Sequence, residues 1–259
     1  MDQYRVKKII QIATQTGKIM LQNGAETYRV EDTVQRMAES RGLSEVNVFV
    51  IPTGIIISAT YNDMTISLLE RVNPEGIDLE CIDRANAFSR EFTSTEMTLE
   101  AAEERIQDLN SPPRFKKWIR VLSSGMGGGF FVLMFGGTAI EFLIGYLASS
   151  LTVLWTEALD NKHLNFFIKN ILGGFAAALF GVVFVRFIGI FDLSASINTV
   201  IIGPLMTLVP GVSLTNGIRD LISGELLAGS AKIMEALFIA IALAFGVGMV
   251  LQFSLKFIS

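Results

Sequence analysis

The residues best suited to binding chemistry lie between positions 203 and 220, in a stretch that is otherwise apolar. Gly203-Pro204 and Pro210-Gly211 interrupt it; proline removes a helical hydrogen bond and glycine tolerates the unwound backbone that follows. The polar residues after the second pair are Ser213, Thr215, Asn216, Arg219 and Asp220. Broken helices with polar groups mark substrate sites in transporters. The pattern favours a site for a small polar solute; a simple proline kink, or a break at the membrane interface, is the alternative.

Two charged residues within or beside apolar segments are further candidates for a direct role, Glu141 and Arg186. Ionisable side chains are costly in lipid and usually face a bundle interior or water. A position on a solute pathway is one interpretation. Snorkelling to the membrane interface competes with it for Glu141, because this residue lies early in an apolar run.

The sequence offers little for enzymatic or metal chemistry. His163 is the only histidine and lies in a polar loop, and Cys81 is the only cysteine. HExxH, GxSxG and Walker motifs are absent from the chain. We therefore expect no catalytic residue, no metal site and no cofactor.

The elements that must position these residues fall into two parts, divided near residue 120. Residues 1–120 hold 15 of the 21 Lys and Arg and 18 of the 25 Asp and Glu, so that the remaining 139 residues carry 13 charges. The mean hydropathy of the chain is +0.49. A net charge of −4, without a basic stripe, argues against nucleic-acid binding. We predict an α+β soluble N-terminal domain followed by an all-α polytopic membrane bundle of about five helices.

The predicted N-terminal domain covers residues 1–113. Periodicity predicts helices over 4–20, from about 24 to 41, and over 77–92 and 95–109, with strands at 46–51, 55–60 and 64–72. Asn23 is expected to cap the second helix, with Glu26 as the capping-box carboxylate. Ser111-Pro112-Pro113 breaks the chain before the membrane domain.

The predicted membrane domain covers residues 114–259. Its expected spans are about 120–137, 138–156, 167–190, 196–213 and 232–254. The basic cluster Arg114, Lys116, Lys117 and Arg120 places the N-terminal domain in the cytoplasm of a cell (inner) membrane protein, and five spans place the C-terminus outside. Residues 1–11 lack an apolar h-region, so we expect no cleavable signal peptide. Small-residue pairs at Gly125/Gly129, Gly174/Ala178 and Ala244/Gly248 are expected to pack helices together.

Two segments resemble the threonine/serine exporter family. They are Gly24-Ala25-Glu26-Thr27-Tyr28-Arg29-Val30-Glu31-Asp32 and the run from Val209 to Gly224, VPGVSLTNGIRDLISG. The resemblance implies a cytoplasmic domain with five membrane helices, and the chain is similar to the split, YjjP-like form. It further implies export of small polar metabolites, threonine and serine or a dicarboxylate such as succinate, driven by proton motive force together with a separate YjjB-like membrane subunit.

The resemblance also suggests roles for individual residues. Asn216 and Arg219 would meet a substrate carboxylate, Asp220 would pair with Arg219 or take a proton, and Pro210-Gly211 would hold the helix break open. For Glu26, Arg29 and Glu31 two readings stay open. They are either a capping box with surface ion pairs, or a gating or docking surface in which Glu26 or Glu31 contacts Arg219. A membrane scaffold or sensor without transport activity remains the alternative function, and homo-oligomerisation is left open.

Overall fold

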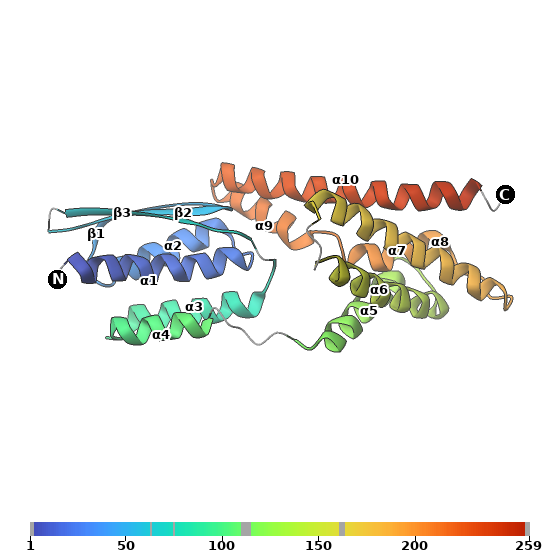
Figure 1. The fold of residues 1–259 in the computed structure, drawn as a ribbon, viewed down its shortest axis with the longest axis horizontal. Helices are drawn as coiled ribbons and strands as arrows, with labels where there is room; N and C mark the ends of the chain where they lie inside the picture. Colours follow the sequence, from blue (N-terminus) through green and yellow to red (C-terminus); the bar gives the residue numbers. More distant parts are fainter. Residues whose placement is uncertain (1–2, 63, 75, 110–114, 161–163, 257–259) are drawn as a thin grey trace. The chain divides into compact units, whose positions relative to one another are not determined.

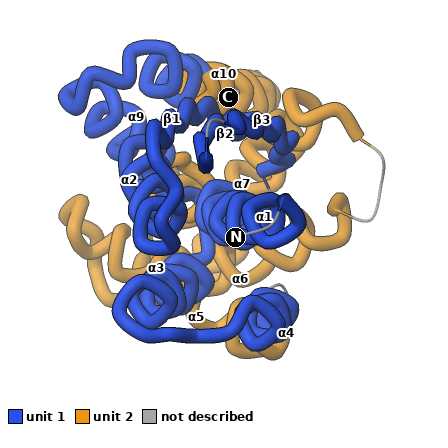
Figure 2. Tube along the Cα trace, turned by 90° about the vertical axis from the view of Figure 1, so that its left-hand side faces the viewer, with its two compact units in different colours: residues 1–113, 211–234 blue, residues 114–210, 235–259 orange. Residues whose placement is uncertain are grey.

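The computed structural model describes residues 3–62, 64–74, 76–109, 115–160 and 164–256. The chain divides into two compact units. Unit 1 consists of residues 1–113 and 211–234, and unit 2 of residues 114–210 and 235–259 (Figure 2). The sequence pattern had placed 211–234 with the membrane part; the domain boundary at 113/114 stays a prediction.

The N-terminal part of unit 1 has the elements that periodicity predicted. They are α1 (Gln3–Gln22), α2 (Thr27–Glu39), β1 (Ser44–Ile51), β2 (Gly54–Tyr61), β3 (Met64–Arg71), α3 (Leu79–Ser94) and α4 (Leu99–Leu109). The strands form an antiparallel sheet in the order β1-β2-β3, with Val50 opposite Ile55 and Ile57 opposite Leu68. The mixed helix and strand composition expected for this part is therefore confirmed.

Helix α1 lies at the centre of this part because its apolar residues surround most of its circumference. The sheet covers α1 and α2 on one side, and α3 and α4 cover α1 on the other (Figure 1). Ile55 and Ile57 of β2 point inward at every second position and join Val6, Ile10 and Phe92 in one fully or almost fully buried core.

Unit 1 also contains α9 (Gly211–Ile222) and residues 226–234 of α10 (Leu226–Lys256). Gly224, with φ +95°, makes the turn between them in the left-handed region that glycine favours. A Cβ at Gly229 would lie 2.6 Å from the carbonyl oxygen of Gly217. The two helices therefore touch backbone to backbone, and only glycine fits at this contact.

Unit 2 is helical. It contains α5 (Lys117–Met134), α6 (Ala139–Asp160), α7 (Phe166–Gly189), α8 (Ile197–Met206) and the remainder of α10. Small residues set its closest contacts, as expected. A Cβ at Gly203 of α8 would lie 2.7 Å from the oxygen of Gly128 in α5, and one at Gly174 of α7 would meet the backbone of Leu243 in α10. Gly248, in contrast, faces open space.

The five predicted spans are only partly recovered. Three helices in the described residues are long and apolar enough to cross a membrane, α6, α7 and α10, and a fourth span is possible if α8 and α9 together form one broken span. Helix α5 is not among them, since its 18 residues begin with Lys117 and Arg120 and continue through serines and glycines. A five-helix membrane bundle is therefore not confirmed. Pro112, Pro113, Arg114 and His163 lie outside the described residues.

The Gly174 contact gives a test of packing in unit 2. Gly174→Ala should lower the free energy of unfolding by about 1–3 kcal/mol, because the added methyl group meets backbone that cannot move aside. Gly248→Ala makes the same change in open space and should be neutral or slightly stabilising, by up to about 1 kcal/mol. Unfolding of both variants in detergent measures the difference; equal losses would contradict the assigned contact.

Candidate functional site: a polar cluster between α2, α9 and α10

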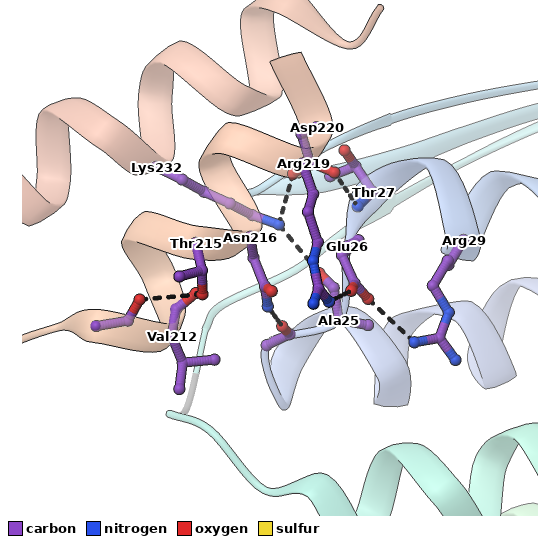
Figure 3. Close-up of polar contacts among 12 residues, drawn as sticks. Ala25, Glu26, Thr27, Arg29, Val212, Thr215, Asn216, Arg219, Asp220 and Lys232 are labelled. Atoms are coloured by element: carbon purple, nitrogen blue, oxygen red, sulfur yellow. Dashed lines mark hydrogen bonds and ion pairs between the residues drawn. The ribbon is translucent and has the colours of Figure 1, made fainter. Parts of the chain in front are cut away.

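The two segments singled out in the sequence meet within unit 1. The connection between α1 and α2 contacts α9 and the first turns of α10, in what we call the α2–α9 cluster (Figure 3). Its members are Gly24, Ala25, Glu26, Thr27, Arg29, Asn216, Arg219, Asp220 and Lys232. The Asn216 amide donates to the Gly24 carbonyl at 2.9 Å, and the Lys232 ammonium donates to the Ala25 carbonyl at 3.0 Å.

The end of α1 leaves the Gly24 and Ala25 carbonyls free to accept hydrogen bonds from α9 and α10. The Asn23 side chain donates to the Ile19 carbonyl at 2.7 Å, and so closes the end of α1. Gly24 then turns the chain with φ +90°. Asn23 is therefore not the N-cap of α2, and the predicted capping box is wrong. Glu26 occupies the N-cap position itself, and its side chain makes no capping hydrogen bond.

Glu26 instead lies between two arginines (Figure 3). Its Oε1 accepts from Arg219 at 2.8 Å and its Oε2 accepts from Arg29 at 3.2 Å. The predicted contact between Glu26 and Arg219 is present, but it is not a surface ion pair, because the Glu26 side chain is only 6% exposed. Burial opposes ionisation of Glu26. Its own backbone N–H and the two guanidinium groups outweigh that effect and hold the pKa below its ordinary value.

The Asp220 side chain caps the N-terminus of α2, which the Glu26 side chain does not. Its Oδ1 accepts from the Thr27 N–H at 3.0 Å, at the first residue of α2, where amides lack partners within the helix. Its Oδ2 accepts from Lys232 at 2.8 Å. The Asp220 side chain is fully buried and that of Lys232 is 11% exposed. A carboxylate at a helix N-terminus is favoured by the helix dipole as well as by the hydrogen bond.

The partner of Asp220 corrects one prediction. Asp220 pairs with Lys232 and not with Arg219, because residues 216, 217 and 220 share the face of α9 that packs on α10. The close contact of Gly217 with Gly229 brings α10 near enough for Lys232 to reach. Lys232 was missed as a site residue, although a lysine at the start of a long apolar run was a usable signal.

The other residues predicted around the helix break make contacts only within their own helix or none that joins the cluster. The helix does end before Pro210 and restart at Gly211, whereas Pro204 lies inside α8. The Thr215 hydroxyl donates to the Gly211 and Val212 carbonyls within its own helix, and Ser213 is half-buried. They contribute no cross-helix contact to the cluster.

Glu31 lies near the cluster but does not contact Arg219. Its Oε1 accepts from the N–H of Val50, on the free edge of β1, at 2.8 Å. Burial raises the pKa of Glu31; the Val50 hydrogen bond partly offsets this, and the nearby charges of Glu225 and Asp220 add to the rise.

Glu141 and Arg186, the candidates in the membrane part, belong to unit 2. Glu141 accepts from the Thr138 N–H at 2.7 Å, and the Glu141 N–H is within 3.3 Å of the Thr138 hydroxyl, which makes a capping box at the start of α6. Its second oxygen accepts from the Ser196 N–H at 2.7 Å, just before α8. Arg186 is exposed near the end of α7 and lines a cavity of about 860 Å³ with Ser194 and Asn198.

The charged and amide groups of the α2–α9 cluster join α2, α9 and α10 and can respond to a change of charge. In the portion of the chain that the structure describes, no group of three or more His, Cys, Asp or Glu could hold a metal ion. Asn216 and Asp220 are buried and bonded to protein partners, while the Arg219 side chain is 63% exposed. In this state Arg219 and Arg29 alone present charged donors outward.

Apolar helices long enough to cross a bilayer, joined to a helical and β-sheet head, define the chain as a membrane protein. The family model described as "Putative threonine/serine exporter" matches residues 11–254, and the chain belongs to this family of transporters.

Among curated relatives, a "Threonine/serine exporter" of Corynebacterium glutamicum is 23% identical over 98% of this chain and 53% of the relative. A "Probable threonine/serine exporter" of Mycobacterium tuberculosis is 22% identical over 95% of this chain and 46% of its own length. The chain thus spans about half the length of these two relatives. The "Probable succinate transporter subunit YjjP" of Escherichia coli is 21% identical over 95% of this chain and 94% of the relative. No solved structure matches the chain.

Because the buried Glu26 carboxylate bonds to both Arg29 and Arg219, we expect a strong energetic coupling between Glu26 and Arg219. A double-mutant cycle of Glu26→Gln and Arg219→Gln should give a coupling energy of about 1–3 kcal/mol in unfolding experiments. The matched control is the exposed pair Asp32–Arg36, also at 2.8 Å, which should give about 0.5 kcal/mol or less. Since the pKa of Glu26 is lowered in the folded state, its contribution is present above the ordinary carboxylate pKa and is lost as the pH falls through the lowered pKa. Equal coupling in both pairs would contradict this assignment.

Breaking the buried Asp220–Lys232 pair should lower stability more than breaking the Glu26–Arg219 pair. Lys232→Met leaves the Asp220 carboxylate buried without its counter-charge and should destabilise the protein by about 3–5 kcal/mol. Adding Asp220→Asn should restore part of the loss. Lys169→Met, in the exposed pair with Asp160, is the control and should change stability by less than about 1 kcal/mol. Thermal unfolding in detergent distinguishes these outcomes, and a double variant less stable than Lys232→Met alone would refute the pairing.

Proposed function

We propose that the chain is a subunit of a secondary exporter of small polar metabolites, with the α2–α9 cluster as its conformational latch. Membership of the threonine/serine exporter family supports the transporter assignment. The latch is proposed because both sequence segments meet in one network of hydrogen bonds and ion pairs, in which both carboxylates are buried. A scaffold or sensor needs no such network at a helix break, so that alternative is less well supported.

The substrate class follows from the relatives and from the exposed guanidinium. Relatives are named for threonine/serine and for succinate, all of which carry carboxylates. We propose that a substrate carboxylate replaces Glu26 on Arg219, which offers bidentate geometry. Asn216 would join the substrate once α9 separates from Gly24, since its amide is occupied in the closed state.

Proton coupling would use the Glu26 carboxylate. The closed state favours ionised Glu26, because two guanidinium groups surround it. Opening removes these partners, raises the pKa and thereby favours proton uptake; by linkage, protonation favours opening.

The chain's placement and partners are also proposals. Lys116, Lys117 and Arg120 at the start of α5 favour a cytoplasmic N-terminal domain in the cell membrane. A separate YjjB-like membrane subunit would supply the second half of the pathway, as the word "subunit" in the YjjP name suggests for that relative. The Arg186 cavity in unit 2 is a candidate for a second solute position along this pathway.

Export of labelled threonine, serine and succinate from loaded cells tests the proposal. The chain should support export together with a YjjB-like subunit, and an uncoupler of the proton gradient should abolish it. Arg219→Ala should reduce export at least about tenfold at normal protein levels, because it removes the proposed carboxylate ligand. Arg71→Ala, an exposed arginine on β3, is the control and should leave export unchanged.

Two results would count against the proposal. Unaltered export by Arg219→Ala would remove Arg219 from the mechanism. Absence of export of all three solutes, with both subunits present in the membrane, would favour the scaffold or sensor.

A further inference from the structure

A groove between α2 and α3 in unit 1 is lined by three arginines. Its volume is about 270 Å³, and its charged lining consists of Arg29, Asp32 and Arg36 from α2 and Arg90 from α3. Positions 29, 32 and 36 recur every three or four residues, so they lie on one face of α2. The groove is therefore a concave surface with an excess of positive charge.

The charges of the groove are only partly neutralised by the protein. Arg36 bonds to Asp32 at 2.8 Å, which uses the only carboxylate of the lining. Arg29 bonds to Glu26 at 3.2 Å. The Arg90 guanidinium makes no ion pair or hydrogen bond within the described part of the chain. One full set of guanidinium donors is thus available in the groove.

These donors suit one chemical class of ligand. A guanidinium presents N–H groups in a planar fork that matches the oxygens of a carboxylate or a phosphate. A water molecule occupies about 30 Å³, so the groove has room for a small anion. Asn86, also in the lining, adds an amide donor.

We propose that this groove binds a small carboxylate or phosphate anion, held by Arg29 and Arg90. The site is separate from Arg219 and goes beyond the proposed transport function, since it would serve as a sensing site on the N-terminal part of the chain.

Arg29 connects this site with the α2–α9 cluster. Arg29 lines the groove, and its guanidinium bonds to Glu26, whose other oxygen accepts from Arg219 (Figure 3). An anion in the groove and the Glu26 carboxylate therefore compete for Arg29. Binding of the anion weakens the clamp on Glu26, and loss of the Glu26 charge strengthens binding of the anion, because coupling between two sites is reciprocal.

Titration calorimetry of the full chain in detergent, with inorganic phosphate and with malonate, tests the proposal. At least one of the two should bind with a Kd of about 1 mM or lower at low ionic strength. Arg90→Gln should weaken binding about tenfold, Glu26→Gln should tighten it several-fold, and Arg71→Gln, outside the groove, should leave it unchanged. The anion that binds more tightly identifies the ligand class.

The proposal is overturned if neither anion binds, or if Arg90→Gln and Arg71→Gln weaken binding equally. Unchanged affinity in Glu26→Gln would overturn the connection to the cluster. Unfolding temperatures of the variants confirm that each is folded, and Arg90 is exposed, so its replacement should not disturb packing. Export measured with Arg219→Ala is independent of these results, so failure of one proposal leaves the other standing.

Discussion

The capping of α2 by Asp220 is the interaction on which the arrangement of unit 1 depends. The donor and acceptor are 193 positions apart, and the amide belongs to a helix start that has no side-chain cap of its own. Lys232 neutralises the same carboxylate and also bonds the Ala25 carbonyl. Because each buried charge has two partners, the pair avoids the penalty of an unsatisfied ion, and α9 cannot leave α2 without exposing both.

A buried carboxylate caps a helix start in this way in both units. In unit 2 the Glu141 carboxylate caps α6 at Thr138 and also binds the N–H of Ser196, before α8. In unit 1 Asp220 of α9 caps α2. In both cases a buried carboxylate joins the start of one helix to a segment far away in the sequence, where free amides and the helix dipole favour negative charge. Charged residues in apolar surroundings here have backbone partners, which is why they are tolerated.

Such a network also suits the proposed transport cycle. Apolar contacts hardly change with pH or with a bound solute, whereas carboxylate–ammonium and carboxylate–guanidinium pairs change with both. A buried pair is strong when complete and costly when one charge is lost, so protonation or a competing carboxylate shifts the balance between two packed states. The glycines at 217 and 229 permit the close approach of α9 and α10, so that Lys232 reaches Asp220 at 2.8 Å.

The sequence by itself determined the elements of the N-terminal part and most residues of the cluster, but not Lys232. Alternation and helical periodicity predicted the three strands and the helices around them, and the sequence also predicted the helix break at Pro210-Gly211. The contact of Glu26 with Arg219 was one of two interpretations that the sequence left open. Tertiary structure decided which charges pair: Asp220 with Lys232, and Glu26 with two arginines in place of a capping box. Periodicity shows which residues share a face of one helix. It does not show which faces of different helices pack together, so the sequence alone cannot tell whether Arg29, Arg219 or Lys232 pairs with a given carboxylate.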